Sequence, residues 1–164
     1  MAKTALVVKL ELSGAREVLA AFRALSKDAS DALRDHSGKL AQKLAGKAAA
    51  DVAAHGGPQG KLVAPTTRVV RDRVPAIQIG GSRRVGRNRT PAYGVLFGSI
   101  FGMTVSSGWY RNARYNASTG RQYRVHRGID AYAFFPVVEQ NQATIAAEWH
   151  AAANQIVRDF NRGA

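Results

Sequence analysis

The chain of 164 residues contains no cysteine, which excludes disulfide bonds and metal sites built on thiolates. It also lacks any run of about 18 apolar residues, the length that a membrane-spanning helix needs. The apolar core of the N-terminal nine residues is too short for a signal peptide, so we expect synthesis in the cytoplasm. Apolar residues make up 46% of the sequence, a normal share for a folded domain.

Acidic residues are scarce. The sequence holds 11 Asp and Glu against 24 Lys and Arg, and its formal net charge is +13. Such a surface favours polyanions, because each phosphate that it neutralises releases condensed counterions. A positive patch that faces an acidic neighbouring protein explains the same composition. The charge balance leaves DNA and an acidic protein partner open.

Residues that could form a catalytic or metal centre are too few and too scattered. Asp130, Glu139 and Glu148 lie too far apart to suggest a two-metal nuclease. The glycine-rich stretch 80–86 is not followed by the Gly-Lys-Ser/Thr of a P-loop. No histidine has a partner at ligand spacing. The histidines are His36, His55, His126 and His150. We therefore expect no enzyme activity, no metal and no cofactor, and a nuclease is the weakest alternative.

Hydrophobic periodicity predicts one α+β domain over residues 1–164, in which a small mixed or antiparallel sheet packs with two long helices. The first helix is expected from about residue 14 to 54, with a restart or kink at Ser26 or Ser30. The second is the C-terminal helix, expected over residues 137–161. The predicted strands are residues 5–12, 66–70, 76–79, 93–97 and 100–105, with 122–126 as a candidate return strand.

A glycine-rich turn carries four arginines within seven residues. It contains no apolar cluster on which their side chains would pack, so packing does not explain them. Guanidinium groups can bind phosphate or carboxylate with two parallel hydrogen bonds. We predict a charged hairpin tip that contacts phosphate or an acidic partner. The arginines are Arg83, Arg84, Arg87 and Arg89.

Residues 103–128 interleave aromatic side chains with arginine and are predicted to form a long projecting loop or hairpin arm. Such interleaving is used to stack on single-stranded nucleic acid and also at protein interfaces. We favour an interface with a neighbouring subunit because the segment looks irregular, with Trp109 and Tyr110 as its anchors. The candidate interface residues are Trp109, Tyr110, Arg111, Arg114, Tyr115, Tyr123 and Arg124.

Two short motifs stand out in the second half of the chain. One is the Tyr-x-x-x-Phe-Gly block within residues 92–98, and the other is the aromatic-Pro step that enters the last helix within residues 133–141. Together with the order of the elements, they resemble the tail-completion, or neck, family of long-tailed bacteriophages. The long stretch 103–128 is similar to the versions found in siphophages of actinobacteria. The residues that carry the motifs are Tyr93, Phe97, Gly98, Phe134, Phe135 and Pro136.

The resemblance implies a virion structural protein at the head-to-tail connection, located in the neck or at the top of the tail after assembly in the host cytoplasm. It implies a homo-oligomeric ring of six or twelve copies that joins the capsid connector to the tail tube. Its partners would be copies of itself, the neighbouring connector and tail proteins, and double-stranded DNA in the channel, with no membrane involved.

The sequence departs from the family pattern at two places. Leu96 stands where an acidic residue usually precedes Phe-Gly, and residues 59–62 replace the usual Thr-Gly-x-Leu step. The layer of the neck therefore stays open between completion protein, terminator and stopper. The alternative from another class is a free-standing basic nucleic-acid-binding protein.

Overall fold

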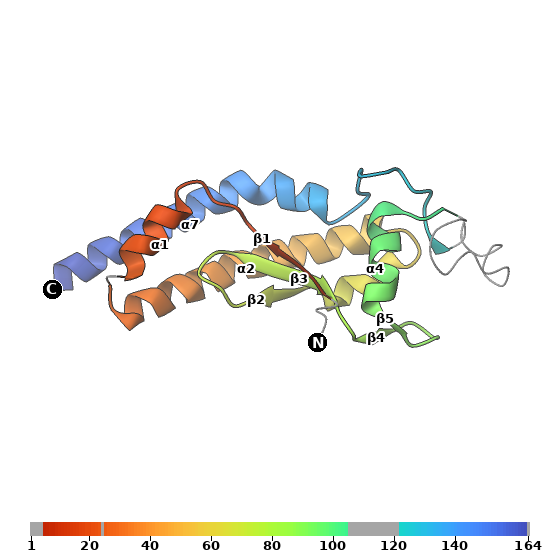
Figure 1. Cartoon of the computed structure of the whole chain (residues 1–164), viewed down its shortest axis with the longest axis horizontal. Coiled ribbons are helices and arrows are strands. Elements are labelled where there is room, and N and C mark those ends of the chain that lie inside the picture. Colours follow the sequence, from red (N-terminus) through yellow and green to blue (C-terminus); the bar gives the residue numbers. More distant parts are fainter. Residues whose placement is uncertain (1–4, 24, 105–121, 164) are drawn as a thin grey trace. The chain divides into compact units, whose positions relative to one another are not determined.

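The computed structural model describes residues 5–23, 25–104 and 122–163. The fold is α+β, as the sequence predicted: two long helices pack with a three-stranded antiparallel sheet, and a separate two-stranded hairpin is present (Figure 1). The chain forms two compact units, and the expectation of a single domain stays a prediction. Unit 1 comprises Met1–Leu6, Gly46–Thr67 and Ile79–Val138, and unit 2 comprises Val7–Ala45, Arg68–Gln78 and Glu139–Ala164.

The sheet has the strand order β1-β3-β2. The strands are β1 (Ala5–Lys9), β2 (Arg68–Val70) and β3 (Ala76–Gly80). β3 is the central strand and is almost wholly buried, which explains its apolar sequence. β2 pairs with β3 in antiparallel register, with Val69 opposite Ile77. The strand predicted at 76–79 is confirmed. The one predicted at 66–70 begins only at Arg68, and the one predicted at 5–12 ends at Lys9.

The helix predicted from residue 14 to 54 is two helices, α1 (Ala15–Arg23) and α2 (Lys27–His55). The restart at Ser26 is confirmed, because its Oγ accepts a hydrogen bond from the backbone N–H of Ala29 at 3.3 Å. Such a side-chain cap satisfies a donor that the first turn of a helix cannot pair internally. The C-terminal helix, α7 (Phe135–Gly163), starts two residues before the predicted boundary.

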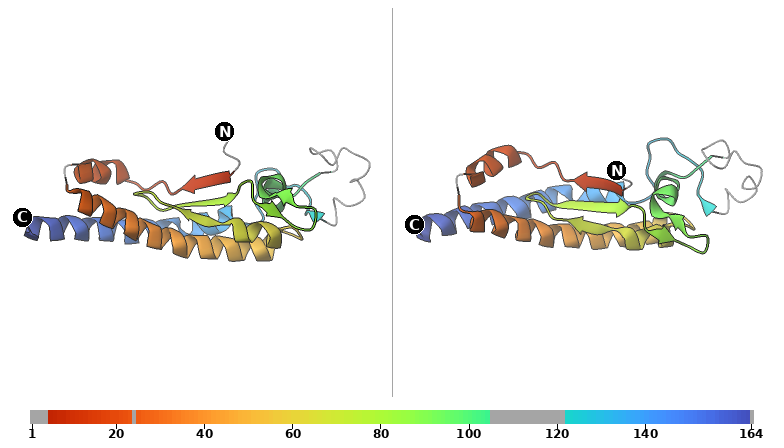
Figure 2. Two further views of the ribbon diagram at one scale, coloured as in Figure 1. Left: turned by 90° about the horizontal axis from the view of Figure 1, so that it is seen from below. Right: turned by 60° about the horizontal axis from the view of Figure 1, so that its bottom comes forward.

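Unit 2 is held together around Trp149 of α7, which is fully buried. Its indole N–H donates to Ser37 Oγ of α2 at 3.0 Å and to the carbonyl of Arg73 at 2.8 Å. Ser37 Oγ donates to the same carbonyl at 2.7 Å. The indole N–H, the Ser37 hydroxyl and the Arg73 carbonyl therefore all have hydrogen-bond partners. Within unit 2, α2 and α7 run side by side along the sheet (Figure 2), and an ion pair joins Lys43 to Glu148.

In unit 1 the structure differs from the secondary structure that the sequence predicted. The strands predicted at 93–97 and 100–105 are wrong: residues Ala92–Phe101 form one helix, α4. Pro91, at the N-cap, favours this start because its missing N–H is not needed there, and Gly102 with φ +75° ends the helix. The buried side chains of Val95, Leu96 and Ile100 recur at helical spacing and face the interior of unit 1.

The remaining elements of unit 1 are short. They are α3 (Gly60–Val63), the 3-10 helix Ala64–Thr66, and the hairpin of β4 (Arg84–Val85) and β5 (Thr90–Pro91). The return strand suggested at 122–126 is a single bridge in the described residues, between Met103 and Val125. None of the described helices has the length and apolar character required to cross a membrane.

Candidate functional site

Charge is distributed very unequally between the two units. Unit 1 contains twelve Lys and Arg against two Asp and Glu, whereas unit 2 contains twelve against nine. Ten of the thirteen net positive charges of the sequence therefore belong to unit 1. In unit 2 the cations have acidic neighbours, since Lys9 pairs with Asp72, Lys43 with Glu148 and Arg34 with Asp31.

The arginine hairpin, residues 83–91, forms as the sequence predicted. β4 and β5 pair with Arg84 opposite Pro91, and the turn uses positive φ at Gly86 (+67°) and Arg89 (+50°). Arg83, Arg84, Arg87 and Arg89 are all exposed. Arg83 Nη1 donates to the carbonyl of Pro65 at 3.2 Å and Arg84 Nη1 to that of Arg89 at 3.1 Å. These bonds to backbone oxygens orient the guanidinium groups without neutralising them, and their contact with phosphate or an acidic partner stays a prediction.

Two residues of the first motif, Tyr93 and Phe97, form an aromatic row on α4 together with Phe101. Their spacing of four places them on one face of the helix. Tyr93 is 43% exposed and Phe97 57%, although both are large apolar groups. The rings of Phe97 and Phe101 are stacked, with 6.4 Å between their centroids and an angle of 13° between their planes. The ring of Phe101 also packs on that of Phe135, with 5.7 Å between the centroids. The row is thus a preformed apolar surface.

Gly98, the third residue of this motif, has a packing role. A Cβ at this position would lie 2.6 Å from Cε1 of Tyr123 and 2.8 Å from Sδ of Met103. Tyr123 is buried, 3% exposed, against this glycine. Tyr123 therefore belongs to the interior of unit 1 and not to the surface of an arm. Trp109, Tyr110, Arg111, Arg114 and Tyr115 lie outside the described residues, so the interface predicted for them stays a prediction.

The loop 122–132 is fixed to the end of α4. The N–H of Met103 donates to the carbonyl of Arg124 at 2.9 Å, and that of Tyr132 donates to the carbonyl of Ile100 at 2.7 Å. The hydroxyl of Tyr132 donates to the carbonyl of Val125 at 2.7 Å and closes the loop. The guanidinium carbons of Arg124 and Arg127 lie 5.0 Å and 3.9 Å from the centre of the Tyr132 ring. Such cation–π contacts hold both charges in place.

The second motif forms the entry into α7. Phe134 is fully buried and has a positive φ of +73°, and its ring meets that of Phe135 edge-on at 5.3 Å. Its N–H donates to Asp51 Oδ2 of α2 at 2.8 Å, while Asp51 Oδ1 lies 2.6 Å from Nδ1 of His55. Pro136 follows in the first turn of α7, where a missing N–H costs little. The carboxylate thereby fixes an unusual backbone conformation at the start of the helix.

Sequence reasoning missed Asp51. In the sequence, Asp51 stands with other aspartates among the lysines of the long helix, a pattern that is typical of a solvated ion-pair face. No local spacing relates Asp51 to Phe134, because the two residues are 83 positions apart. The alanines around Asp51 in α2 indicate only that another segment of the chain can pack closely on the helix there.

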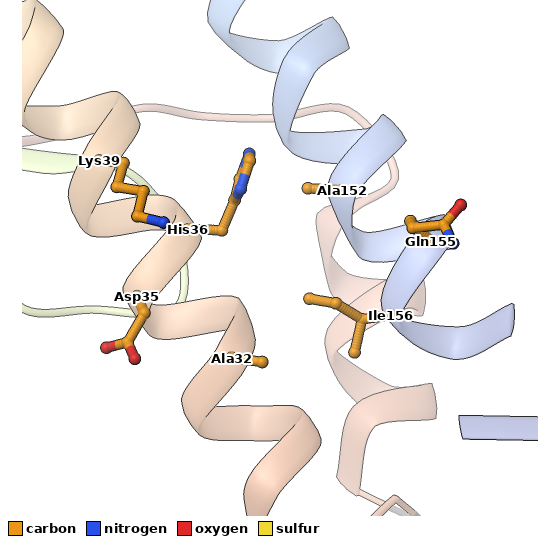
Figure 3. A pocket seen from close by; sticks show the side chains of 7 residues that line it. All are labelled: Ala32, Asp35, His36, Lys39, Ala152, Gln155 and Ile156. Carbon is orange, nitrogen blue, oxygen red and sulfur yellow. The ribbon is translucent and has the colours of Figure 1, made fainter. Parts of the chain in front are cut away.

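Unit 2 contains an open groove between α2 and α7 (Figure 3). His36 and Ile156 project into the space between the helices, whereas Asp35 projects away from α7. His36 Nε2 is buried and has no hydrogen-bond partner in the part of the chain that the structure describes. Small side chains on both helices leave the space open. The lining residues are Ala32, Asp35, His36, Lys39, Ala152, Gln155 and Ile156.

The described residues contain no group of three His, Asp or Glu side chains that could hold a metal ion. His126 Nδ1 lies 3.2 Å from the carbonyl of Phe101, and His150 Nε2 lies 2.8 Å from that of Ser13, so both rings contact backbone oxygens. No protein-family model, curated protein or solved structure matches the chain.

Proposed function

We propose that the protein is a structural component of the head-to-tail connection of a long-tailed bacteriophage. In this proposal it forms a ring of six or twelve copies between the DNA-filled capsid connector and the tail tube. The resemblance in the two motifs motivates the proposal. Tyr93 and Phe97 of the first motif belong to the exposed aromatic row, and Phe134 of the second motif is buried at the entry into α7.

One observation carries the proposal: most of the net positive charge of the chain and the two most exposed aromatic side chains of the described residues, Tyr93 and Phe97, occur in the same unit. Twelve cationic residues against two acidic ones in unit 1 would repel one another in a free monomer. An exposed apolar row on the same unit favours association with other proteins. A ring component that surrounds DNA and meets further proteins needs both properties. A ring also requires heterologous contacts, in which one face of a subunit binds a different face of the next.

Negative-stain or cryo-electron images of the purified protein test the proposal directly. We expect closed rings, and we expect a tagged copy to be located at the neck in images of assembled particles. The double variant Arg84→Glu/Arg87→Glu should fold normally, because both side chains are exposed, and should block head-tail joining. Arg16→Glu/Arg23→Glu on α1 of unit 2 is a charge-matched control. A protein that stays monomeric at all concentrations and is absent from particles would overturn the proposal.

A free-standing nucleic-acid-binding protein is the second candidate, and the exposed arginine hairpin favours it. Binding of this kind depends steeply on salt, because counterions are released from the phosphates. Sedimentation with and without duplex DNA separates the two functions. Rings that form without DNA support the neck protein, whereas a monomer that binds DNA tightly at low salt supports the alternative.

We further propose that the protein acts without catalytic turnover. Plasmid DNA incubated with the protein and magnesium or manganese should stay intact. Cleavage that depends on the metal and is abolished by Asp130→Ala would instead establish a nuclease.

A further inference from the structure

Two adjoining elements of unit 1 expose large apolar side chains to water. α4 contributes the aromatic row, and the loop 122–132 contributes Val125, 74% exposed, and Ile129, 93% exposed. Two backbone hydrogen bonds, from the N–H of Met103 to the carbonyl of Arg124 and from the N–H of Tyr132 to the carbonyl of Ile100, keep these two elements together at the end of α4. Exposed apolar side chains on adjoining elements are a feature of interaction sites. The docking surface is defined as Tyr93, Phe97, Phe101, Val125 and Ile129.

The docking surface is preformed. Phe97 is held by stacking on Phe101, and the loop is closed by the hydroxyl of Tyr132 on the carbonyl of Val125. Ile129 follows Gly128, whose φ of +71° places it in a turn, and a hydrogen bond from the N–H of Asp130 to the carbonyl of Arg127 spans that turn at 3.4 Å. The docking surface therefore loses little conformational entropy when a partner binds to it.

We propose that the docking surface binds an acidic face of a neighbouring protein that has apolar side chains at its centre. The inference rests on the proposed function, in which a neighbour in the neck supplies that face. Charge complementarity carries it: Arg124 and Arg127 are fixed over Tyr132 beside the apolar groups. The arginine hairpin leads directly into α4, so cations precede and follow the row in the chain.

The two acidic residues of unit 1 are too few to neutralise its twelve cations. Unit 1 has only Asp51 and Asp130, and Asp51 already accepts the N–H of Phe134 and contacts His55. Carboxylates from a partner would meet guanidinium groups that are already oriented, which favours hydrogen bonds from two N–H groups at once.

Nucleic acid fits this surface less well. The phosphates of a duplex suit the arginines but give Phe97 and Ile129 nothing to pack on. Single strands stack bases on open aromatic faces, whereas Phe97 and Phe101 already turn a face toward each other. Two copies of the chain that met through this surface would bring the two most positive regions together, which costs free energy.

Fluorescence anisotropy with three labelled probes tests the proposal on the full chain. The probes are an amphipathic helical peptide of glutamate and leucine, a polyglutamate peptide of the same charge, and a short DNA duplex. The wild-type protein should bind the amphipathic peptide about tenfold more tightly than polyglutamate, the effect of one central apolar anchor. Phe97→Ser and Ile129→Ser should each remove that preference and leave polyglutamate and duplex binding unchanged. Phe160→Ser, at an exposed apolar side chain of unit 2, is the matched control and should keep it.

Four results would overturn the inference. They are equal binding of both peptides by the wild type, an unchanged preference in Phe97→Ser, loss of self-association in Phe97→Ser, and a shift of Trp109 emission in the free Phe97→Ser protein, measured in a Trp149→Phe background so that Trp109 alone emits. The third would make a second copy the occupant, and the fourth would place the chain's own segment there. Ring formation is measured on the same samples by sedimentation. Rings without the peptide preference would refute the docking surface alone, whereas the preference without rings or particle localisation would refute the proposed function alone.

Discussion

Units 1 and 2 contain the same number of lysine and arginine residues but surround them differently. In unit 2 nine acidic residues accompany the cations, and pairs such as Lys43 with Glu148 connect α2 to α7. In unit 1 only two acidic residues are present, and the arginines instead contact backbone carbonyls and the Tyr132 ring. Their large apolar groups differ in the same sense: Trp149 of unit 2 is fully buried, whereas Phe97 of unit 1 is exposed. The comparison indicates that unit 2 balances more of its charge with its own acidic residues, whereas unit 1 leaves an excess of cations and a large aromatic side chain exposed to water.

The largest expected effect is in unit 2, at Trp149. Trp149→Ala removes a fully buried ring and leaves the carbonyl of Arg73 with one fewer donor, so it should cost about 3–5 kcal/mol of unfolding free energy. Trp149→Phe keeps most of the volume but loses the indole N–H, and should cost about 1–3 kcal/mol. Urea denaturation followed by circular dichroism measures both. A Trp149→Ala protein as stable as the wild type would show that unit 2 is not organised around this residue.

In unit 1, two consecutive residues of α4 give a matched test. Leu96 is 1% exposed and its Cδ2 packs against Gly80, so Leu96→Ala should cost about 2–4 kcal/mol. Phe97→Ser changes a side chain that is mostly in water and should change stability by less than about 1 kcal/mol. The same denaturation experiment applies to both variants. Equal losses would mean that Phe97 belongs to the core of unit 1, and the contrast between the units would then disappear.

The error at α4 shows where the sequence is ambiguous. A spacing of four residues puts Tyr93, Phe97 and Phe101 on one face of a helix and also on one face of a strand, because four is close to 3.6 and a multiple of two. Val95 distinguishes a helix from a strand. A strand would place Val95 on the same face as Tyr93 and Phe97, whereas in the structure Val95 is buried and the two aromatic side chains are exposed. Aromatic and β-branched residues favoured strands locally, but tertiary packing, such as Tyr123 on Gly98, decided for a helix.

The other parts of the prediction depended on signals of different range. The long helices and the strands β2 and β3 followed from local periodicity, and the arginine hairpin followed from its glycine-rich turn. The exposed state of the aromatic row could not be predicted, because local sequence does not show which apolar face stays in contact with water. Asp51 was missed for a related reason: its hydrogen bond to Phe134 connects residues that no pattern relates.

An intermediate effect is expected at Asp51, the acidic residue that unit 1 uses internally. Asp51→Ala leaves the buried N–H of Phe134 without its acceptor and removes support for a positive φ, which should cost about 1–3 kcal/mol. If backbone strain contributes, Asp51→Ala should cost less in a Phe134→Gly background than in the wild type, because glycine adopts the positive φ without support. Amide hydrogen exchange at the start of α7 measures the local effect. Unchanged protection there in Asp51→Ala would contradict the assigned role.

The smallest expected effect on stability concerns the ion pair between Lys9 and Asp72 in unit 2. It tests whether the paired charges of unit 2 stabilise the fold. Partial burial alone would raise the pKa of Asp72, but the hydrogen bond and charge of Lys9 and the backbone N–H groups of Arg73 and Val74 outweigh it and lower the pKa. The carboxylate is therefore stabilised in the folded state. Its contribution is present above about pH 4, the ordinary range of an aspartate, and is lost as the pH falls through the lowered folded pKa.

Because Lys9 is more than half exposed, water and salt weaken this pair, and its contribution should be about 0.5 kcal/mol. Asp72→Asn and Lys9→Met should both lower the urea midpoint slightly at neutral pH. The gap between Asp72→Asn and the wild type should close in strongly acidic solution, where the wild-type carboxyl is protonated as well, and it should narrow in high salt. A gap that persists in acid would mean that Asp72 acts through packing or neutral hydrogen bonds, and the paired charges of unit 2 would then contribute less to its stability than the comparison assumes.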